Sequence, residues 1–165
     1  MRKIIANTTP LIALAEIGQL DILRLLYDSV IIPEAVLQEI IEEPAKSEVH
    51  CANWIQTQSI QHPEEKQFYR ARLHAGEVEV LILAREIQAD LLLIDDNTAK
   101  KAAKFAGFSV TGTLGILLRA KRAGLIHSVA PLLNQLSDRG FYVAEKIRTY
   151  VLNAAEEGGE ELRSD

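Results

Sequence analysis

The chain has 165 residues, of which 48% are hydrophobic and 25% are charged, a composition typical of a globular domain and not of a disordered chain. A formal net charge of −5 argues against a protein that coats nucleic acid through bulk electrostatic attraction. The single cysteine, Cys51, excludes an internal disulfide and a zinc site built on cysteines.

The first part of the sequence alternates apolar runs with helical patterns. Thr9 followed by Pro10 predicts an N-cap and the first turn of a helix, and Glu43-Pro44 ends a later one. The expected elements, in chain order, are a strand at 3–6, a helix from 10 to 17, a short helix at 20–27, a strand at 29–32 and a helix at 34–42.

The second part continues this alternation after a segment that is difficult to interpret, residues 44–66. The expected elements are a short helix at 49–54, a weak edge strand at 56–60, a helix at 77–88, a strand at 91–94, a helix at 97–106, a short strand at 108–110 and two or three helices within 114–155. Residues 156–165 are acidic and glycine-rich, and we expect a frayed tail there.

Alternating strands and helices predict a three-layer α/β/α sandwich with a central parallel sheet. No internal repeat or linker divides residues 1–155, so we expect a single domain. Neither a G-x-G-x-x-G loop after a strand nor a P-loop is present, which argues against dinucleotide and Walker-type nucleotide binding. No signal peptide or apolar run of membrane-spanning length is seen, so the sequence predicts a cytoplasmic protein that does not enter membranes.

Two adjacent carboxylates, Asp95 and Asp96, follow the apolar strand at 91–94. The strand has no alternation, which is typical of a strand buried on both faces of a parallel sheet. Ligands of such sheets bind beyond the carboxyl ends of the strands, so the pair is a candidate site. In the alternative interpretation, Asp95 only ends the strand, and Asp96 or Asn97 only caps the next helix.

Other polar residues are expected at the same edge of the sheet. Asn7 follows the first strand, and Glu77 begins a helix whose period turns Glu77 inward and Glu79 toward water. Glu39 is a further candidate at a semi-buried helical position. The structural alternative for Glu77 is an acid in the first turn of a helix, where the helix dipole favours a negative charge. The structural alternative for Glu39 is a helical acid that faces solvent.

Several inward carboxylates raise one another's pKa values unless a cation neutralises them. Oxygen ligands without histidine or cysteine favour Mg²⁺ or Mn²⁺ over zinc. The chemistry that suits such a site is phosphodiester hydrolysis, in which the metal activates water and stabilises charge on the phosphate. The four histidines lack ligand-like spacing and are expected at the surface: His50, His62, His74 and His127.

Two basic clusters are candidates for phosphate binding. Lys100, Lys101 and Lys104 follow the acid pair. Arg119, Lys121 and Arg122 form the second cluster, for which complementing the dipole at the end of a helix before Gly124 is the alternative.

Four motifs in order resemble those of the PIN-domain superfamily, and closest is a poorly characterised prokaryotic branch. The motifs are Ile-Ile-Ala-Asn-Thr-Thr-Pro-Leu-Ile at 4–12, Gly-Glu-Val-Glu-Val-Leu-Ile-Leu-Ala at 76–84, Leu-Leu-Leu-Ile-Asp-Asp at 91–96 and Val-Thr-Gly-Thr-Leu-Gly-Ile-Leu at 110–117. The resemblance covers about residues 3 to 155, and the ordered set is much more specific than any one motif.

The resemblance implies an α/β/α fold and, for many members, a Mg²⁺- or Mn²⁺-dependent ribonuclease, including toxins paired with a small antitoxin protein. A homodimer is a further expectation. Carried over by position, the implied metal and catalytic positions are Asn7, Glu39, Glu77 and either Asp95 or Asp96, and the implied hydroxyls for a metal-bound water or a phosphate are Thr8, Thr9 and Thr113. The chain departs from the family's pattern at Asn7, where the pattern has aspartate. Because an amide offers one neutral oxygen, metal affinity and water activation should fall.

These observations leave three hypotheses. The first is a PIN-type ribonuclease acting on single-stranded RNA, weakened by Asn7. The second is a catalytically silent module that binds RNA or an antitoxin. The third, a phosphotransfer domain of receiver or haloacid-dehalogenase type, needs a nucleophilic aspartate on an early strand, which Asn7 does not provide.

Overall fold

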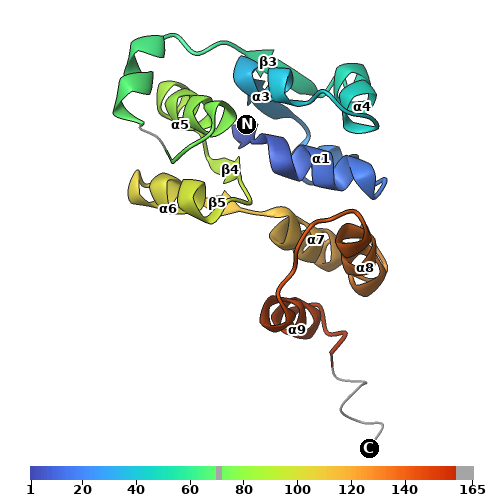
Figure 1. Cartoon of the computed structure of the whole chain (residues 1–165). Coiled ribbons are helices and arrows are strands. Elements are labelled where there is room, and N and C mark those ends of the chain that lie inside the picture. The colour runs from blue at the N-terminus through green and yellow to red at the C-terminus, as the bar shows by residue number, and fades with distance from the viewer. Residues whose placement is uncertain (70–71, 159–165) are drawn as a thin grey trace, which may run out of the picture.

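The computed structural model describes residues 1–69 and 72–158 and contains a five-stranded sheet between layers of helices (Figure 1). All strand pairs are parallel, and the order across the sheet is β3-β2-β1-β4-β5. The strands are β1 (Ile4–Ala6), β2 (Val30–Pro33), β3 (Ile55–Gln58), β4 (Leu91–Leu93) and β5 (Val110–Thr111). The expected α/β/α architecture with a parallel sheet is confirmed.

Helices cover both faces of this sheet. They are α1 (Thr8–Glu16), α2 (Ile22–Tyr27), α3 (Glu34–Glu39), α4 (Ala45–Cys51), the 3₁₀-helix η1 (Pro63–Phe68), α5 (Ala75–Ile87), α6 (Asn97–Phe105), α7 (Thr113–Arg122), α8 (Ala130–Asp138) and α9 (Glu145–Ala154). In Figure 1, α5 and α6 lie on one side of the strands and α1 and α7 on the other, and α9 lies beyond α7. Within the described residues, no helix is both long and apolar enough to cross a membrane.

The two central strands form the middle of the hydrophobic core. Ile5 of β1 pairs with Leu92 of β4, and both side chains are fully buried. Ala6 pairs with Leu93, and the N–H of Asn7 donates to the Leu93 carbonyl at 2.9 Å. Because parallel strands end together, the residues that follow β1 and β4 meet at one edge of the sheet.

Several helix boundaries differ from those expected. Asn7, and not Thr9, is the N-cap of α1. The helix expected at 34–42 ends at Glu39. Helix α4 begins and ends before the helix expected at 49–54, because Trp54 already belongs to the edge of the sheet, where its carbonyl accepts the Val30 N–H. The 3₁₀-helix η1 at 63–68 has no counterpart among the expected elements, and residues 70–71 lie outside the described residues.

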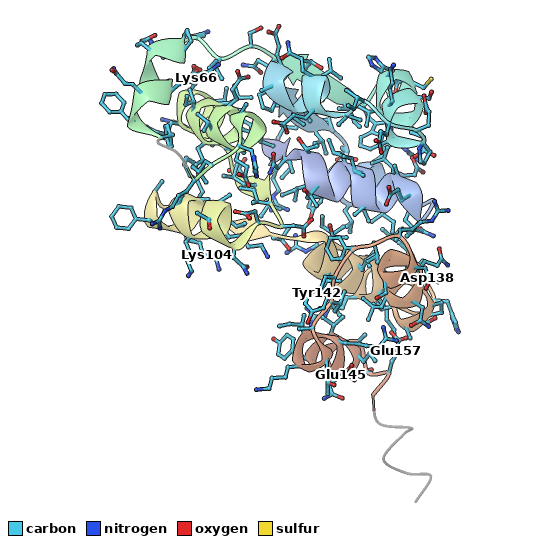
Figure 2. The ribbon with its side chains drawn as sticks, in the orientation of Figure 1. Lys66, Lys104, Asp138, Tyr142, Glu145 and Glu157 are labelled. Atoms are coloured by element: carbon cyan, nitrogen blue, oxygen red, sulfur yellow. The ribbon has the colours of Figure 1, made fainter. Side chains whose placement is uncertain are left out.

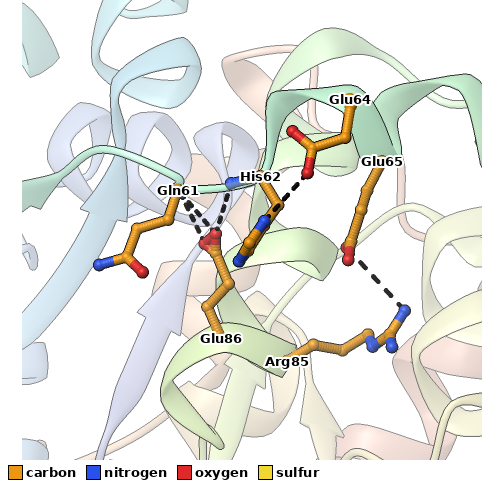
Figure 3. A network of polar contacts seen from close by, with 6 residues as sticks. All are labelled: Gln61, His62, Glu64, Glu65, Arg85 and Glu86. Atoms are coloured by element: carbon orange, nitrogen blue, oxygen red, sulfur yellow. Dashed lines mark hydrogen bonds and ion pairs between the residues drawn. The ribbon is translucent and has the colours of Figure 1, made fainter.

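The expectation that Glu79 faces water is wrong. Glu79 is only 8% exposed; it accepts the Ala35 N–H at 3.1 Å and pairs with the Lys66 ammonium at 2.9 Å. Glu86, on the same side of α5, accepts the backbone N–H of Gln61 (Figure 3). The helical period indicated the correct side, but α3 and residues 61–66 cover it.

Glu157 lies in the segment for which fraying was expected, and it makes defined contacts. Its carboxylate accepts hydrogen bonds from the Lys121 ammonium at 2.9 Å and from the N–H groups of Val129 at 2.8 Å and Ala130 at 3.0 Å. These contacts connect the turn after α9 to the end of α7 and the start of α8. Residues 159–165 lie outside the described residues.

Candidate functional site

The polar residues after β1 and β4 meet residues from α3 and α5 at the carboxyl edge of the sheet. A hollow of about 350 Å³ at this edge is lined by Asn7, Thr8, Thr9, Glu39, His74 and Glu77. Asp95 and Asp96 follow β4 at the same edge. We call this set of residues the acidic edge.

Asn7 contributes an oxygen that no neighbour uses. Its side chain is 4% exposed, and its Oδ1 atom has no hydrogen-bond partner among the described residues. Buried polar atoms in native proteins are nearly always satisfied, and an exception is a candidate for contact with an ion or ligand. Asn7 is also one of the residues that line the hollow.

Glu77 is the most buried carboxylate of the acidic edge, with 3% exposure. Its Oε1 atom accepts the His74 N–H at 2.8 Å at the start of α5. Burial raises the pKa of Glu77, and the nearby carboxylates of Asp96 and Glu39 raise it further, against the lowering effect of the His74 N–H. Asp96 and Glu39 are thus charged neighbours of Glu77, and a bound cation would reduce the repulsion among these carboxylates.

Asp96 caps α6, as the alternative interpretation of the acid pair predicts. Its Oδ2 atom accepts the Ala99 N–H at 2.9 Å, and its side chain is exposed. The cap uses only one carboxylate oxygen. The second oxygen, Oδ1, has no hydrogen-bond partner in the described part of the chain.

Asp95 points elsewhere, although it is adjacent to Asp96. Its Oδ1 atom accepts the Thr113 N–H at 2.7 Å, and its Oδ2 atom accepts the Thr113 hydroxyl at 2.6 Å. Burial raises the pKa of Asp95, while the two Thr113 bonds and the Lys100 ammonium act to lower it. Both oxygens of Asp95 therefore hold the start of α7, where Thr113 is fully buried.

Glu39 is engaged in the same way on the other flank. Its Oε2 atom accepts the Thr8 hydroxyl at 2.6 Å, and its Oε1 atom accepts the Gly76 N–H at 2.8 Å. A Cβ atom on Gly76 would lie 2.5 Å from Glu39 Oε2, so only glycine permits this approach. The half-buried Glu39 thus joins the starts of α1 and α5.

Three oxygens of the acidic edge have no hydrogen-bond partner within residues 1–69 and 72–158. They are Asn7 Oδ1, Glu77 Oε2 and Asp96 Oδ1, and we call them the central oxygens. No group of three or more Asp, Glu, His or Cys side chains in the same described residues is arranged to hold a metal ion. A cation here would use two carboxylates and the Asn7 amide, a donor set that suits Mg²⁺ or Mn²⁺.

The basic candidates separate into two locations. Lys100 lies near Asp95, and its ammonium acts to lower the pKa of Asp95 against the larger raising effect of burial. Arg119 lines a different hollow, with Arg2 and Leu91, at the amino ends of the strands. The Lys121 ammonium donates to the Ala155 carbonyl and to Glu157, and it therefore has protein partners where a phosphate was expected.

The sequence interpretation missed three residues of the edge. His74 lines the hollow, and its backbone binds Glu77, although its side chain is exposed like those of the other histidines. Gly76 and Gly112 make room for Glu39 and Asp95, respectively. The available signal was a glycine at the N-cap of α7 and another in the first turn of α5, where the missing side chain leaves room for a neighbouring group.

The threonine hydroxyls have unequal roles. Those of Thr8 and Thr113 donate to Glu39 and Asp95, whereas Thr9 is exposed beside the hollow.

No curated protein matches the chain. Residues 3–157, nearly the whole chain, match a family model described as a PIN domain, and the chain therefore belongs to the PIN-domain family.

Proposed function

We propose that the protein is a metal-dependent ribonuclease that hydrolyses phosphodiester bonds of single-stranded RNA with Mg²⁺ or Mn²⁺. The observation that carries the proposal is the set of central oxygens in a chain with a nuclease-like PIN fold. Asn7 Oδ1 supports it most strongly, because a buried acceptor without a partner costs folding free energy that a bound cation would offset.

The central residues suit this chemistry. Asn7, Glu77 and Asp96 would hold the cation, which when bound would activate water and neutralise charge on the phosphate. Burial raises the pKa of Glu77 and the Asp96 charge raises it further, which supports the assignment, because a cation would favour the ionised form of both carboxylates. Since Asn7 is neutral, the affinity for the cation should be lower than with aspartate.

The flanking residues would position the centre without binding the cation. Glu39 and Asp95 have both oxygens engaged, and they connect the first turns of α1, α5 and α7 to the edge. Thr9 lies in the first turn of α1, where backbone N–H groups and the helix dipole favour a phosphate oxygen.

The decisive experiment compares two adjacent aspartates in cleavage of single-stranded RNA with Mn²⁺. Asparagine caps helices as well as aspartate does, so Asp96→Asn should keep the fold and lose about 100-fold or more in cleavage, given that even outer partners of metal ligands cost 10–100-fold. The matched variant Asp95→Asn should keep most of its activity below its melting temperature. Full cleavage by a folded Asp96→Asn protein would contradict the proposal.

A catalytically silent RNA- or antitoxin-binding protein is the second candidate. The observation that favours it is that every carboxylate of the acidic edge already accepts a hydrogen bond from the protein. This candidate predicts RNA or antitoxin binding without turnover with any metal, and binding that survives Asp96→Asn. Metal-dependent cleavage that Asp96→Asn removes would exclude it.

A further inference from the structure

A second hollow, of about 350 Å³, lies on the other side of Asp95. It is formed by the starts of α6 and α7 and by the chain that connects α8 to α9. Lys100, Gly112, Phe141, Tyr142 and Ile147 are among its lining residues, and we call it the Tyr142 hollow. Figure 2 shows Tyr142 on this connecting chain, beside α7.

Gly112 explains why two polar groups meet at the floor of this hollow. A Cβ atom at residue 112 would lie 2.7 Å from Asp95 Oδ1 and 3.0 Å from Lys100 Nζ. The φ angle of Gly112 is −104°, which any residue can adopt, so space and not backbone conformation requires glycine. Its absent side chain lets the Lys100 ammonium approach the edge that holds the acid pair.

The Lys100 ammonium has unused capacity to bind an anion. Asp95 already accepts two hydrogen bonds from Thr113, and no ion pair within 4.0 Å joins Asp95 to Lys100 in the described residues. Lys100 Nζ and Asp95 Oδ1 nevertheless border the same small space, the one that a Cβ atom on Gly112 would fill. An ammonium with no carboxylate partner among these residues, at the rim of a hollow, is a natural contact for a phosphate.

The walls of the hollow are apolar and partly aromatic. Tyr142 is 87% exposed and Ile147 is 48% exposed, and the half-buried Phe141 and Leu114 lie between them and the core. An exposed ring next to an unpaired cation is the arrangement that proteins use to stack unpaired bases and hold the backbone of a single strand. The volume is at the lower end of the range for small-ligand pockets, which suits one base.

We propose that the Tyr142 hollow binds one nucleotide of the RNA strand, with its base stacked on Tyr142 and its phosphate in contact with Lys100. This inference rests on the proposed function, because RNA is the ligand in both. Asp95 lines the hollow and adjoins Asp96 of the central oxygens. The bound nucleotide is therefore a close neighbour of the phosphodiester bond that is cleaved.

Binding is tested without metal, so that cleavage does not contribute. Fluorescence anisotropy of a labelled single-stranded RNA of about eight nucleotides, within the range of known single-strand site sizes, is measured in EDTA. Tyr142→Ala should weaken binding about tenfold, as loss of one stacked base does, and Tyr142→Phe should bind like the wild type. Phe105→Ala is the matched control, because Phe105 is 97% exposed and lies outside the hollow.

The cation is tested by the dependence of binding on salt. Lys100→Ala should reduce the slope of log K against log salt by about 0.7, the value for one phosphate contact on a single strand. Lys101→Ala removes an exposed lysine next to it on the same helix but outside the hollow, and it should change the slope less. Equal slopes for the two variants would overturn the assignment of Lys100.

An abasic substitution moved along the RNA separates stacking from a structural effect. In the wild type, one abasic position should weaken binding more than the others, and in Tyr142→Ala this difference should disappear. If the same position remains sensitive in Tyr142→Ala, or if no position is sensitive in the wild type, the Tyr142 hollow is not a base site.

The outcomes distinguish this inference from the proposed function. Loss of RNA binding in Tyr142→Ala without cleavage in any metal would leave the base site standing and remove the nuclease. Cleavage with unchanged binding and KM in Tyr142→Ala and Lys100→Ala would do the reverse. If Tyr142→Ala instead converts a dimer into a monomer in sedimentation and leaves RNA binding intact, the hollow is an interface between copies of the chain and the inference is wrong.

Discussion

On the two flanks of the acidic edge, Glu39 and Asp95 give both carboxylate oxygens to hydrogen bonds within the protein, whereas in the centre Glu77 and Asp96 give only one each. A carboxylate with both oxygens engaged joins elements of the fold. One with a free oxygen can also bind a cation, together with the amide oxygen of Asn7, which has no hydrogen-bond partner among the described residues. The same residue types at one edge therefore separate into structural and ligand-binding groups, and the difference can be measured.

Glu77→Gln should have the largest effect. The amide can still accept the His74 N–H, so the start of α5 is preserved, but one central negative charge is lost. We expect RNA cleavage with Mn²⁺ to fall by about 100-fold or more, since even outer partners of metal ligands cost 10–100-fold. The measurement is a single-turnover cleavage rate together with calorimetric titration of Mn²⁺.

The matched flank variant for this comparison is Glu39→Gln. It should bind Mn²⁺ nearly as the wild type does, because Glu39 uses both oxygens for Thr8 and Gly76. If Glu39→Gln loses Mn²⁺ as completely as Glu77→Gln does, the division into centre and flanks fails.

Asn7→Asp should have the next largest effect, and in the opposite direction. A third central carboxylate strengthens cation binding, by about tenfold if one charge contributes about 1.4 kcal/mol, the free energy of a tenfold change. Without metal, the added charge repels Glu77 and Asp96 and should lower the melting temperature in EDTA. An Asn7→Asp protein with unchanged Mn²⁺ affinity would show that Asn7 is not a ligand.

Thr113→Val tests a flank, and its effect should fall on stability. The substitution nearly conserves volume at a fully buried position but removes the hydroxyl that Asp95 Oδ2 accepts. Loss of one partner of a buried pair should lower the free energy of unfolding by about 1–3 kcal/mol. Urea denaturation measures this, and cleavage at low temperature should change little; a large loss of cleavage at unchanged stability would place Thr113 in the centre.

Glu157 is a reference carboxylate outside the edge and should show the smallest effect. Burial acts to raise its pKa, but hydrogen bonds from Ala130, Val129 and Lys121 outweigh burial and lower the pKa below its ordinary value of 4.5. A lowered pKa stabilises the fold above pH 4.5, and this contribution is lost as the pH falls through the lowered pKa.

The measurement for Glu157 is the melting temperature as a function of pH. As the pH falls below about 4.5, the wild type should lose more stability than Glu157→Gln. Parallel curves for the two proteins would show that Glu157 does not contribute in this way.

The fold was largely predictable because apolar runs, turns and helix starts are local signals. The run at 91–94 indicated a buried strand, and the residues after it met the edge of the sheet as expected. Glu79 was misjudged because its environment depends on residues 61–66, which a helical period cannot reveal.

The different roles of Asp95 and Asp96 were not predictable from the sequence. Adjacent residues at the end of a strand point in different directions, and which one turns outward depends on a partner far along the chain. Thr113, which is 18 residues from Asp95, binds both of its oxygens. The glycines at 76 and 112 were local sequence signs of such long-range contacts, since both leave room for a carboxylate.

The neutral amide of Asn7 also determines the electrical balance of the loaded site. Glu77 and Asp96 together carry two negative charges, which one divalent cation would cancel, so the loaded centre would be electroneutral. With aspartate at residue 7, the same centre would keep a net negative charge facing an anionic RNA backbone. The amide that lowers the affinity for the cation would thus also remove an electrostatic barrier to the approach of the RNA.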